Sequence, residues 1–154
     1  MSTTGHAKTT IDRATFTITF QRTFQAPRED VFDAWTQPEQ LAEWWDPSGA
    51  RLAECAVDLR PGGAFKLVNR DSVHGPPFTG VYRVIERASL LVFDAMGALG
   101  TVRLDNERGL TQMTVTIRCA SAEHLEQFVK LGVDVGTERT LDNLVAHLAD
   151  HHRA

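Results

Sequence analysis

The sequence predicts an α+β protein in which a curved antiparallel sheet of seven strands packs around one long C-terminal helix. Residues 121–152 contain no proline and carry apolar side chains on two faces at helical spacing. Residues 51–119 instead alternate with the period of strands, and hairpin-length connections join them. Because such a sheet is apolar on one side only, it needs a cover, and the long helix is the one element large enough.

The N-terminal part of the chain predicts a flexible segment followed by a strand. Residues 1–14 are polar, so we expect them to be flexible and expect a single domain over residues 15–152. Residues 16–24 form the first predicted strand, in which polar side chains alternate with apolar ones at Phe16, Ile18, Phe20 and Phe24.

Two short helices are predicted between the first and second strands. Residues 28–36 have apolar side chains at helical spacing, and a second helix starts at Pro38, an early helical position where the missing N–H is tolerated. The run DPSG at residues 46–49 ends this helix. All three tryptophans of the chain lie in these two helices: Trp35, Trp44 and Trp45.

Six further strands complete the predicted sheet. The turns RPGG and NERG and the loop DSVHGPP separate them, and these are strong turn signals. The short connections favour antiparallel neighbours. The predicted strands are residues 52–59, 64–70, 78–86, 89–95, 99–106 and 110–119.

The C-terminal helix is predicted to run from Ser121, a good N-cap, through residue 152. Gly132 and Gly136 fall inside it, where glycine costs roughly 1 kcal/mol relative to alanine. We expect a compensation for this cost. Either the sheet approaches the helix closely at these positions, or the glycines leave empty space.

Composition excludes several classes of protein. The 154 residues carry a formal net charge of −4 without a cluster of basic residues, so we expect no nucleic-acid partner. No apolar run is long enough for membrane insertion, and no secretory leader is visible, so we expect a cytoplasmic protein. Cys55 and Cys119 lack metal-ligand spacing and are expected to be reduced packing residues. We expect no metal and no cofactor.

Four segments resemble the activator-of-Hsp90-ATPase-homologue-like family: APREDVFDAWTQPEQLAEWWDP, DLRPGGAFKL, FTGVYRVIE with LLVFD, and GTERTLDNLVAHL. The resemblance implies the START-like helix-grip fold of polyketide cyclases and lipid-transfer proteins, with a cavity between sheet and helix. Two positions depart from the family pattern. Asp46 replaces a glycine and is expected to place a carboxylate near the cavity mouth, and Thr137 replaces a tryptophan and is expected to enlarge the space beside the helix.

The candidate ligand-binding residues lie on inward faces of the predicted strands and helices. Each has two interpretations, core packing or the wall of an apolar pocket. Gly80, Gly132 and Gly136 favour a void because three side chains are missing on those surfaces, and close backbone packing is the alternative. The candidate set is Trp35, Trp44, Trp45, Phe65, Phe78, Tyr82, Phe93, Met113, Phe128 and Gly132.

Polar candidates are fewer. Arg22 interrupts an apolar face and needs a partner, for which Asp94 is one candidate. Alternatively, an arginine such as Arg83 could recognise a ligand carboxylate, and contact of Asp94 with a ligand is left open. His74 in the predicted loop could act as a general acid or base, although a solvated loop histidine is more common. His147 and His151 are four residues apart, but without a third ligand they are expected to stabilise the helix end.

Three functions are compatible with this pattern. The first is binding of a hydrophobic small molecule or lipid-like ligand. The second is a cyclase- or hydrolase-like enzyme in the same cavity, with Tyr82, His74 or Asp94 as proton donor or acceptor and the catalytic residues otherwise unknown. The third is a protein-interaction module. The chaperone partner is disfavoured because the co-chaperone's extra N-terminal domain is absent from this sequence, and a homodimer remains open.

Overall fold

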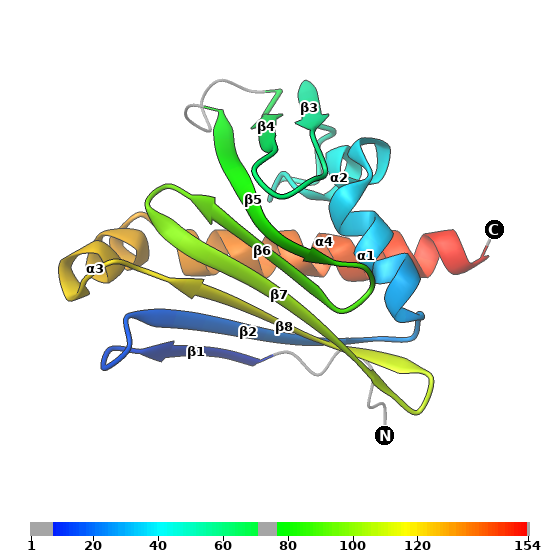
Figure 1. The fold of residues 1–154 in the computed structure, drawn as a ribbon. Coiled ribbons are helices and arrows are strands. Elements are labelled where there is room, and N and C mark those ends of the chain that lie inside the picture. The colour runs from blue at the N-terminus through cyan, green and yellow to red at the C-terminus, as the bar shows by residue number, and fades with distance from the viewer. Residues whose placement is uncertain (1–7, 71–76, 154) are drawn as a thin grey trace.

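The computed structural model describes residues 8–70 and 77–153 and has the predicted α+β architecture. A curved antiparallel sheet in the order β1-β2-β8-β7-β6-β5-β4-β3 lies in front of α4 in Figure 1. The elements are β1 (Lys8–Asp12), β2 (Thr17–Phe24), α1 (Arg28–Thr36), α2 (Pro38–Trp44), β3 (Glu54–Val57), β4 (Ala64–Val68), β5 (Phe78–Glu86), β6 (Leu90–Ala95), β7 (Ala98–Glu107), β8 (Leu110–Arg118), α3 (Ala122–Lys130) and α4 (Val133–Arg153).

The described residues form eight strands rather than the predicted seven. The additional strand, β1, lies within the segment predicted to be flexible, so that prediction is wrong for Lys8–Asp12. The strand pairs antiparallel with β2, with Thr10 opposite Thr19. Its residues are mostly polar, and the strand lies at the edge of the sheet.

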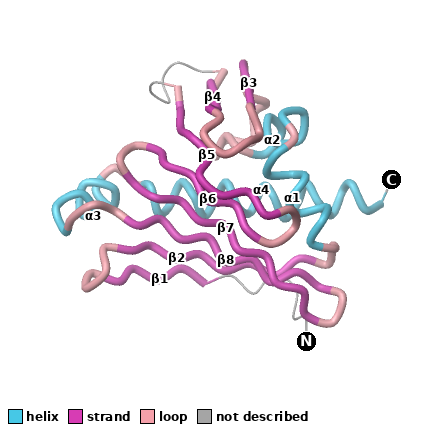
Figure 2. Tube along the Cα trace, in the orientation of Figure 1, coloured by secondary structure: helices cyan, strands magenta, loops and turns pink. Residues whose placement is uncertain are grey.

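The helices cover one face of the sheet, as the tube in Figure 2 shows. Helix α4 packs against β2 and against both short helices, while α1 contacts β7 and β8. Helix α2 packs on β3 at the far end of the sheet. No helix among the described residues is both long and apolar enough to span a membrane.

The predicted single C-terminal helix is two helices, which corrects the interpretation of its glycines. Ser121 is the predicted N-cap, and its hydroxyl accepts a hydrogen bond from the His124 N–H at 3.1 Å. Helix α3 then ends, because Gly132 has φ +77°, a conformation that stops a helix and favours glycine. A Cβ added at Gly132 would meet no atom within 4 Å, and at Gly136 the nearest would be Pro47 Cγ at 4.0 Å. Neither glycine is pressed against the sheet.

A β-bulge in β5 changes the face that its residues present. The register of β5 with β6 shifts between Tyr82 and Val84. Tyr82 is 2% exposed, as its alternation predicts, but Val84 is 36% exposed and Ile85 takes the inward position instead. Alternation from Tyr82 therefore does not continue to Val84, because one extra residue in a strand inverts the alternation beyond it.

Candidate functional site

Three tryptophans and four other aromatic residues form a continuous cluster between the short helices and the β3–β6 end of the sheet. Trp35 of α1 packs edge-on against Trp44, with ring centroids 4.9 Å apart, and lies 6.4 Å from Trp45. Trp45, directly after α2, reaches across to Phe78 of β5 at 5.1 Å. The cluster therefore connects the helical layer to the sheet.

Phe65 of β4 is the centre of the cluster on the sheet side. Its ring centroid lies 5.7 Å from that of Phe78, 5.1 Å from that of Tyr82 and 5.5 Å from that of Phe93 on β6. These separations fall within the range that favours attractive aromatic contacts. Four segments far apart in the sequence thus supply one apolar surface.

This surface lines a small cavity that is partly open to solvent. The space open to the centre of a water molecule is about 20 Å³, close to the requirement for one water. Six of the predicted site residues line it, together with three leucines that were not predicted. The wall comprises Trp35, Leu41, Trp45, Phe65, Leu67, Phe78, Tyr82, Leu91 and Phe93.

The three leucines could have been found from periodicity. Leu67 shares the inward face of β4 with Phe65, and Leu41 shares the apolar side of α2 with Trp44. They were missed because the prediction selected aromatic residues. The wall contains no α4 residue. The cavity therefore lies between the sheet and the short helices. The sequence had predicted it between the sheet and the C-terminal helix.

The other four predicted site residues lie outside this wall. Trp44 is fully buried and its indole N–H donates to the Ala34 carbonyl at 3.0 Å. Met113 is fully buried, and its sulfur accepts from Trp35 Nε1 at 3.4 Å. Phe128 packs on the His124 ring at 4.5 Å, and Gly132 occupies the turn between α3 and α4. Their contact with a ligand stays a prediction.

Two strand glycines make room for the aromatic rings. A Cβ at Gly80 would lie 2.3 Å from Phe65 Cζ and 2.4 Å from the Asp94 carbonyl oxygen. A Cβ at Gly100 would lie 2.6 Å from the Phe93 ring. Of the two alternatives for Gly80, close packing is therefore correct, and the missing side chain is replaced by a neighbouring ring.

The RPGG turn between β3 and β4 fixes the position of Tyr82. The Gly62 N–H donates to the Tyr82 carbonyl at 2.8 Å, and the Tyr82 N–H donates to the Gly63 carbonyl at 2.9 Å. At Gly63 a Cβ would lie 2.1 Å from the Asp58 carbonyl oxygen, so only glycine fits. The turn thus holds the β5 backbone at the bulge and directs the Tyr82 ring toward Phe65.

Two weakly acidic groups lie in this region. Burial, with a smaller effect of the nearby Cys55, raises the pKa of the Tyr82 phenol above its ordinary value. Burial, followed by the charge of Glu39, raises the pKa of the Cys55 thiol to about 11, while Arg51 opposes the shift. Both groups are neutral at physiological pH, so the surroundings of the cavity favour uncharged groups.

Helix α4 holds the C-terminal end of α2 through two polar side chains. The Thr140 hydroxyl donates to the Trp45 carbonyl at 3.0 Å, and Asn143 Nδ2 donates to the Asp46 carbonyl at 2.9 Å. The Asp46 side chain is 1% exposed and accepts bonds from the Ser48 N–H and hydroxyl, both at 2.9 Å. Asp46 is not one of the wall residues, although its neighbour Trp45 is, so its predicted place near the cavity mouth stays a prediction.

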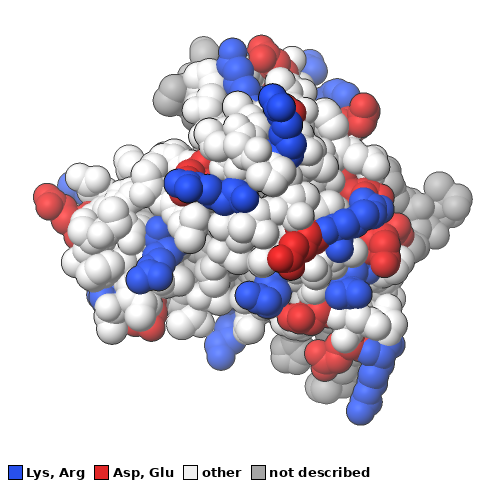
Figure 3. Space-filling view, viewed as in Figure 1, with Lys and Arg blue, Asp and Glu red and all other residues white. Residues whose placement is uncertain are grey.

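The predicted partner of Arg22 is also wrong. Arg22 is 3% exposed, its Nε lies 3.6 Å from Asp142 Oδ1 of α4, and that Nε has no hydrogen-bond partner. Asp94 instead pairs with Arg83, and both side chains are on the solvent side of the sheet. Figure 3 shows basic and acidic groups interspersed on that face. Neither Arg83 nor Asp94 lines the cavity.

The histidines provide no metal site in the part of the chain that the structure describes. His74 and the His151 side chain lie outside the described residues. His147 Nε2 is 3.1 Å from Gln40 Oε1, which links α4 to α2. No group of three potential metal ligands occurs among the described residues.

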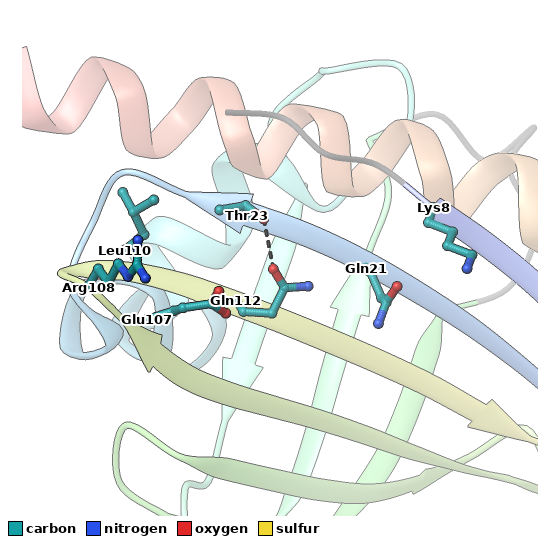
Figure 4. Close-up of a pocket in the computed structure, with 7 residues that line it drawn as sticks. All are labelled: Lys8, Gln21, Thr23, Glu107, Arg108, Leu110 and Gln112. Carbon is teal, nitrogen blue, oxygen red and sulfur yellow. Dashed lines mark hydrogen bonds between the residues drawn. The ribbon is translucent and has the colours of Figure 1, made fainter. Parts of the chain in front are cut away.

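A larger hollow lies on the opposite, outer face of the sheet beside β1 and the β7–β8 hairpin. Its volume is about 460 Å³, and its described lining is polar, with the exception of Leu110. Figure 4 shows the Thr23 hydroxyl donating to Gln112 Oε1, at 2.8 Å, across two adjacent strands. A ligand whose polar groups leave water to bind this polar surface gains little binding free energy. The aromatic cavity is therefore the better candidate despite its smaller size.

A sheet that curves over a C-terminal helix, with short helices closing an aromatic cavity, defines a protein of the START-like class. The chain belongs to the family described as "Activator of Hsp90 ATPase homolog 1-like protein", whose profile matches residues 25–149. This fold is a known ligand-binding scaffold. The chain has no match among the curated proteins.

Solved structures confirm the fold. Protein Ms6760 from Mycobacterium smegmatis is 22% identical, with a TM-score of 0.79 over 94% of this chain and 98% of its own. A protein from Rhodobacter sphaeroides is 23% identical, with a TM-score of 0.81 over 94% and 99%. The AHSA1-like protein from Aeromonas hydrophila is 24% identical, with a TM-score of 0.70 over 87% and 94%. Identities at this level establish a common fold.

Proposed function

We propose that the protein binds a hydrophobic small molecule in the aromatic cavity. The observation that supports this most strongly is the convergence of six predicted aromatic residues on one cavity whose nine lining side chains carry no charge. Each 100 Å² of apolar ligand surface removed from water would contribute about 2.5 kcal/mol. An aromatic wall therefore favours an apolar ligand of modest size.

Binding requires the cavity to open. Its present space of about 20 Å³ is far below the several hundred that ligand pockets commonly provide. Trp45, Phe78 and Phe93 are only partly buried, whereas Phe65, Leu67 and Leu91 behind them are buried. The outer rings can therefore rotate away with less loss of packing than the inner ones, and we place the mouth at Trp45 and Phe78.

The wall also favours binding over acid–base catalysis. Its described residues include no carboxylate and no imidazole. Among the described wall residues a proton transfer would depend on Tyr82, and the raised pKa of its phenol opposes ionisation. Cyclase- or hydrolase-like turnover and a complex with a chaperone are the alternative functions that experiment can test.

Titration with Nile red, a neutral fluorescent probe, tests the proposal. We expect saturable binding of one probe per chain and a change in tryptophan emission, because Trp35 and Trp45 both line the cavity. The variant Trp45→Ala should change the affinity of the protein for Nile red. Leu131→Ala, at a residue that is 75% exposed and not part of the cavity wall, is the matched control and should leave the affinity unchanged. Absent or unsaturable binding by a folded sample would overturn the proposal.

A further inference from the structure

The hydrogen-bonding groups of the cavity indicate which kind of apolar molecule fits. Among the nine wall residues only three carry such groups, namely the indole N–H of Trp35, the indole N–H of Trp45 and the hydroxyl of Tyr82. Trp35 already donates to Met113. The other two make no side-chain hydrogen bond within the described residues, so they are the groups available to a ligand.

The Tyr82 hydroxyl is the more informative of these two groups. The residue is 2% exposed and held in place by Gly62 and Gly63, yet its hydroxyl has no hydrogen-bond partner among the residues that the structure describes. The only fully buried side-chain polar atom without a partner in the described part of the chain is Arg22 Nε. The Tyr82 hydroxyl is therefore not completely enclosed. The Tyr82 ring lines the cavity, and we infer that its hydroxyl reaches this space.

We propose that the ligand is a neutral, planar molecule with a carbonyl-type hydrogen-bond acceptor, and that the Tyr82 hydroxyl donates to this acceptor. This inference rests on the proposed function and specifies the chemistry of the same site. The Tyr82 hydroxyl can donate or accept, whereas the Trp45 indole N–H can only donate, so an acceptor is the group that both side chains can bind. The matching group on the ligand is an acceptor.

The charge of the ligand follows from the same wall. An ionised group transferred into the cavity would lose its hydration and meet no opposite charge on the nine lining side chains. Planarity follows from the flat ring faces of Trp45, Phe65 and Phe78, which favour offset stacking with another ring. A carboxylate of the same shape should therefore bind much less tightly than a ketone.

Three naphthalene derivatives of matched shape test this inference: 2-acetylnaphthalene, which has the acceptor, 2-isopropenylnaphthalene, which lacks it, and 2-naphthoate, which is charged. Affinities are measured by displacement of Nile red and by calorimetry. One neutral hydrogen bond corresponds to a preference of about three- to tenfold for the acetyl compound over the isopropenyl compound. We expect 2-naphthoate to bind at least about tenfold less tightly than the acetyl compound.

The variant Tyr82→Phe keeps the ring and removes the hydroxyl. In this variant we expect the preference for the acetyl over the isopropenyl compound to fall to about one, whereas Leu131→Ala should preserve it. Thermal unfolding verifies that Tyr82→Phe is folded, and if it is not, the three ligands compared on the unmodified chain still decide the acceptor and charge preferences.

The outcomes separate this inference from the proposed function. If neither Nile red nor any of the three compounds binds, the proposed function is wrong. If they bind with equal affinity, if the acetyl preference survives in Tyr82→Phe, or if 2-naphthoate binds most tightly, the cavity is a binding site but the present inference is wrong.

Discussion

Beneath β2, β8 and β7 the core is mainly aliphatic and sealed, whereas beneath β4 to β6 it is aromatic and incompletely filled. We call these the aliphatic half and the aromatic half. In the aliphatic half Ile18, Val102, Met113 and Leu144 are all at most 1% exposed. In the aromatic half Trp45, Phe78 and Phe93 remain partly exposed around a cavity. One sheet thus has two kinds of interior.

The position of α4 explains this difference. Its backbone packs closely on β2 and on the two short helices. Medium-sized side chains can fill a narrow layer of that kind at the density of a protein interior. Toward β4 to β6, long aromatic side chains from α1 and from the end of α2 reach across to the sheet, as Trp45 does to Phe78. Rigid rings fill a wide space with gaps, and those gaps form the cavity.

The comparison predicts unequal costs for the same leucine truncation. Leu144→Ala, in the aliphatic half, should lower the free energy of unfolding by about 3–4 kcal/mol, because a sealed core cannot collapse around the lost methyl groups. Leu41→Ala, in the cavity wall, should cost about 2 kcal/mol, because its side chain already borders empty space. Urea unfolding measures both. Equal costs would contradict the assignment of a looser aromatic half.

Leu41→Ala should also enlarge the cavity. We expect Nile red to bind more tightly to this variant and unchanged to Leu144→Ala, relative to the unmodified chain. A reversed pattern would place the binding cavity in the aliphatic half.

The two strand glycines sharpen the comparison within the aromatic half. Gly80→Ala forces a Cβ against the Asp94 carbonyl as well as the Phe65 ring, so the backbone must move, at a cost of about 2–3 kcal/mol. Gly100→Ala presses only on the far edge of the Phe93 ring, which can rotate, and should cost about 1 kcal/mol. Thermal unfolding ranks the two, and a larger loss for Gly100→Ala would show that Phe93 is the more firmly held ring.

Side-chain alternation predicted the sheet and its inward faces because apolar burial acts on single strands. It predicted β2 and β8, and it placed Phe65 and Tyr82 on the inner side. It failed beyond the bulge after Tyr82 because a bulge depends on how two strands register, which neither strand sequence reveals.

The helix break and the location of the cavity could not be predicted for a related reason. Gly132 ends α3 through a positive φ, yet a mid-helix glycine and a helix-ending glycine look alike in a periodic pattern. Six of the aromatic candidates line the cavity because large rings are both core and pocket material, and their contact with a ligand stays a prediction. Which of them border empty space depends on the distance between layers, and Trp44 and Met113 fell on the filled side.

The exception in the aliphatic half is Arg22, a buried cation that is only loosely paired with Asp142. The cost of burying its Nε without a hydrogen-bond partner offsets much of the stabilisation that the ion pair with Asp142 contributes. Arg22→Leu should therefore change the free energy of unfolding by less than about 1 kcal/mol, or increase it. Asp142→Asn, which leaves the cation with weaker compensation, should be the more destabilising of the two. A loss as large as that of Leu144→Ala would show that Arg22 is an essential part of this core.

The smallest expected effect concerns Cys55, a thiol at the border of the aromatic half. Its pKa is raised to about 11 from the ordinary 9.0, mainly by burial. A raised thiol pKa means that the neutral form is favoured in the folded chain. Its stabilising contribution is therefore complete below about pH 9 and is lost as the pH rises toward 11.

The rate of alkylation of Cys55 measures this pKa directly in a Cys119→Ala background, where only one thiol remains. We expect the rate to rise with pH to a midpoint near 11, well above that of a small thiol under the same conditions. A midpoint at or below 9.0 would mean that water reaches the thiol freely. The neighbourhood of Tyr82 would then be wetter than the apolar wall requires, and the preference for neutral ligands would weaken with it.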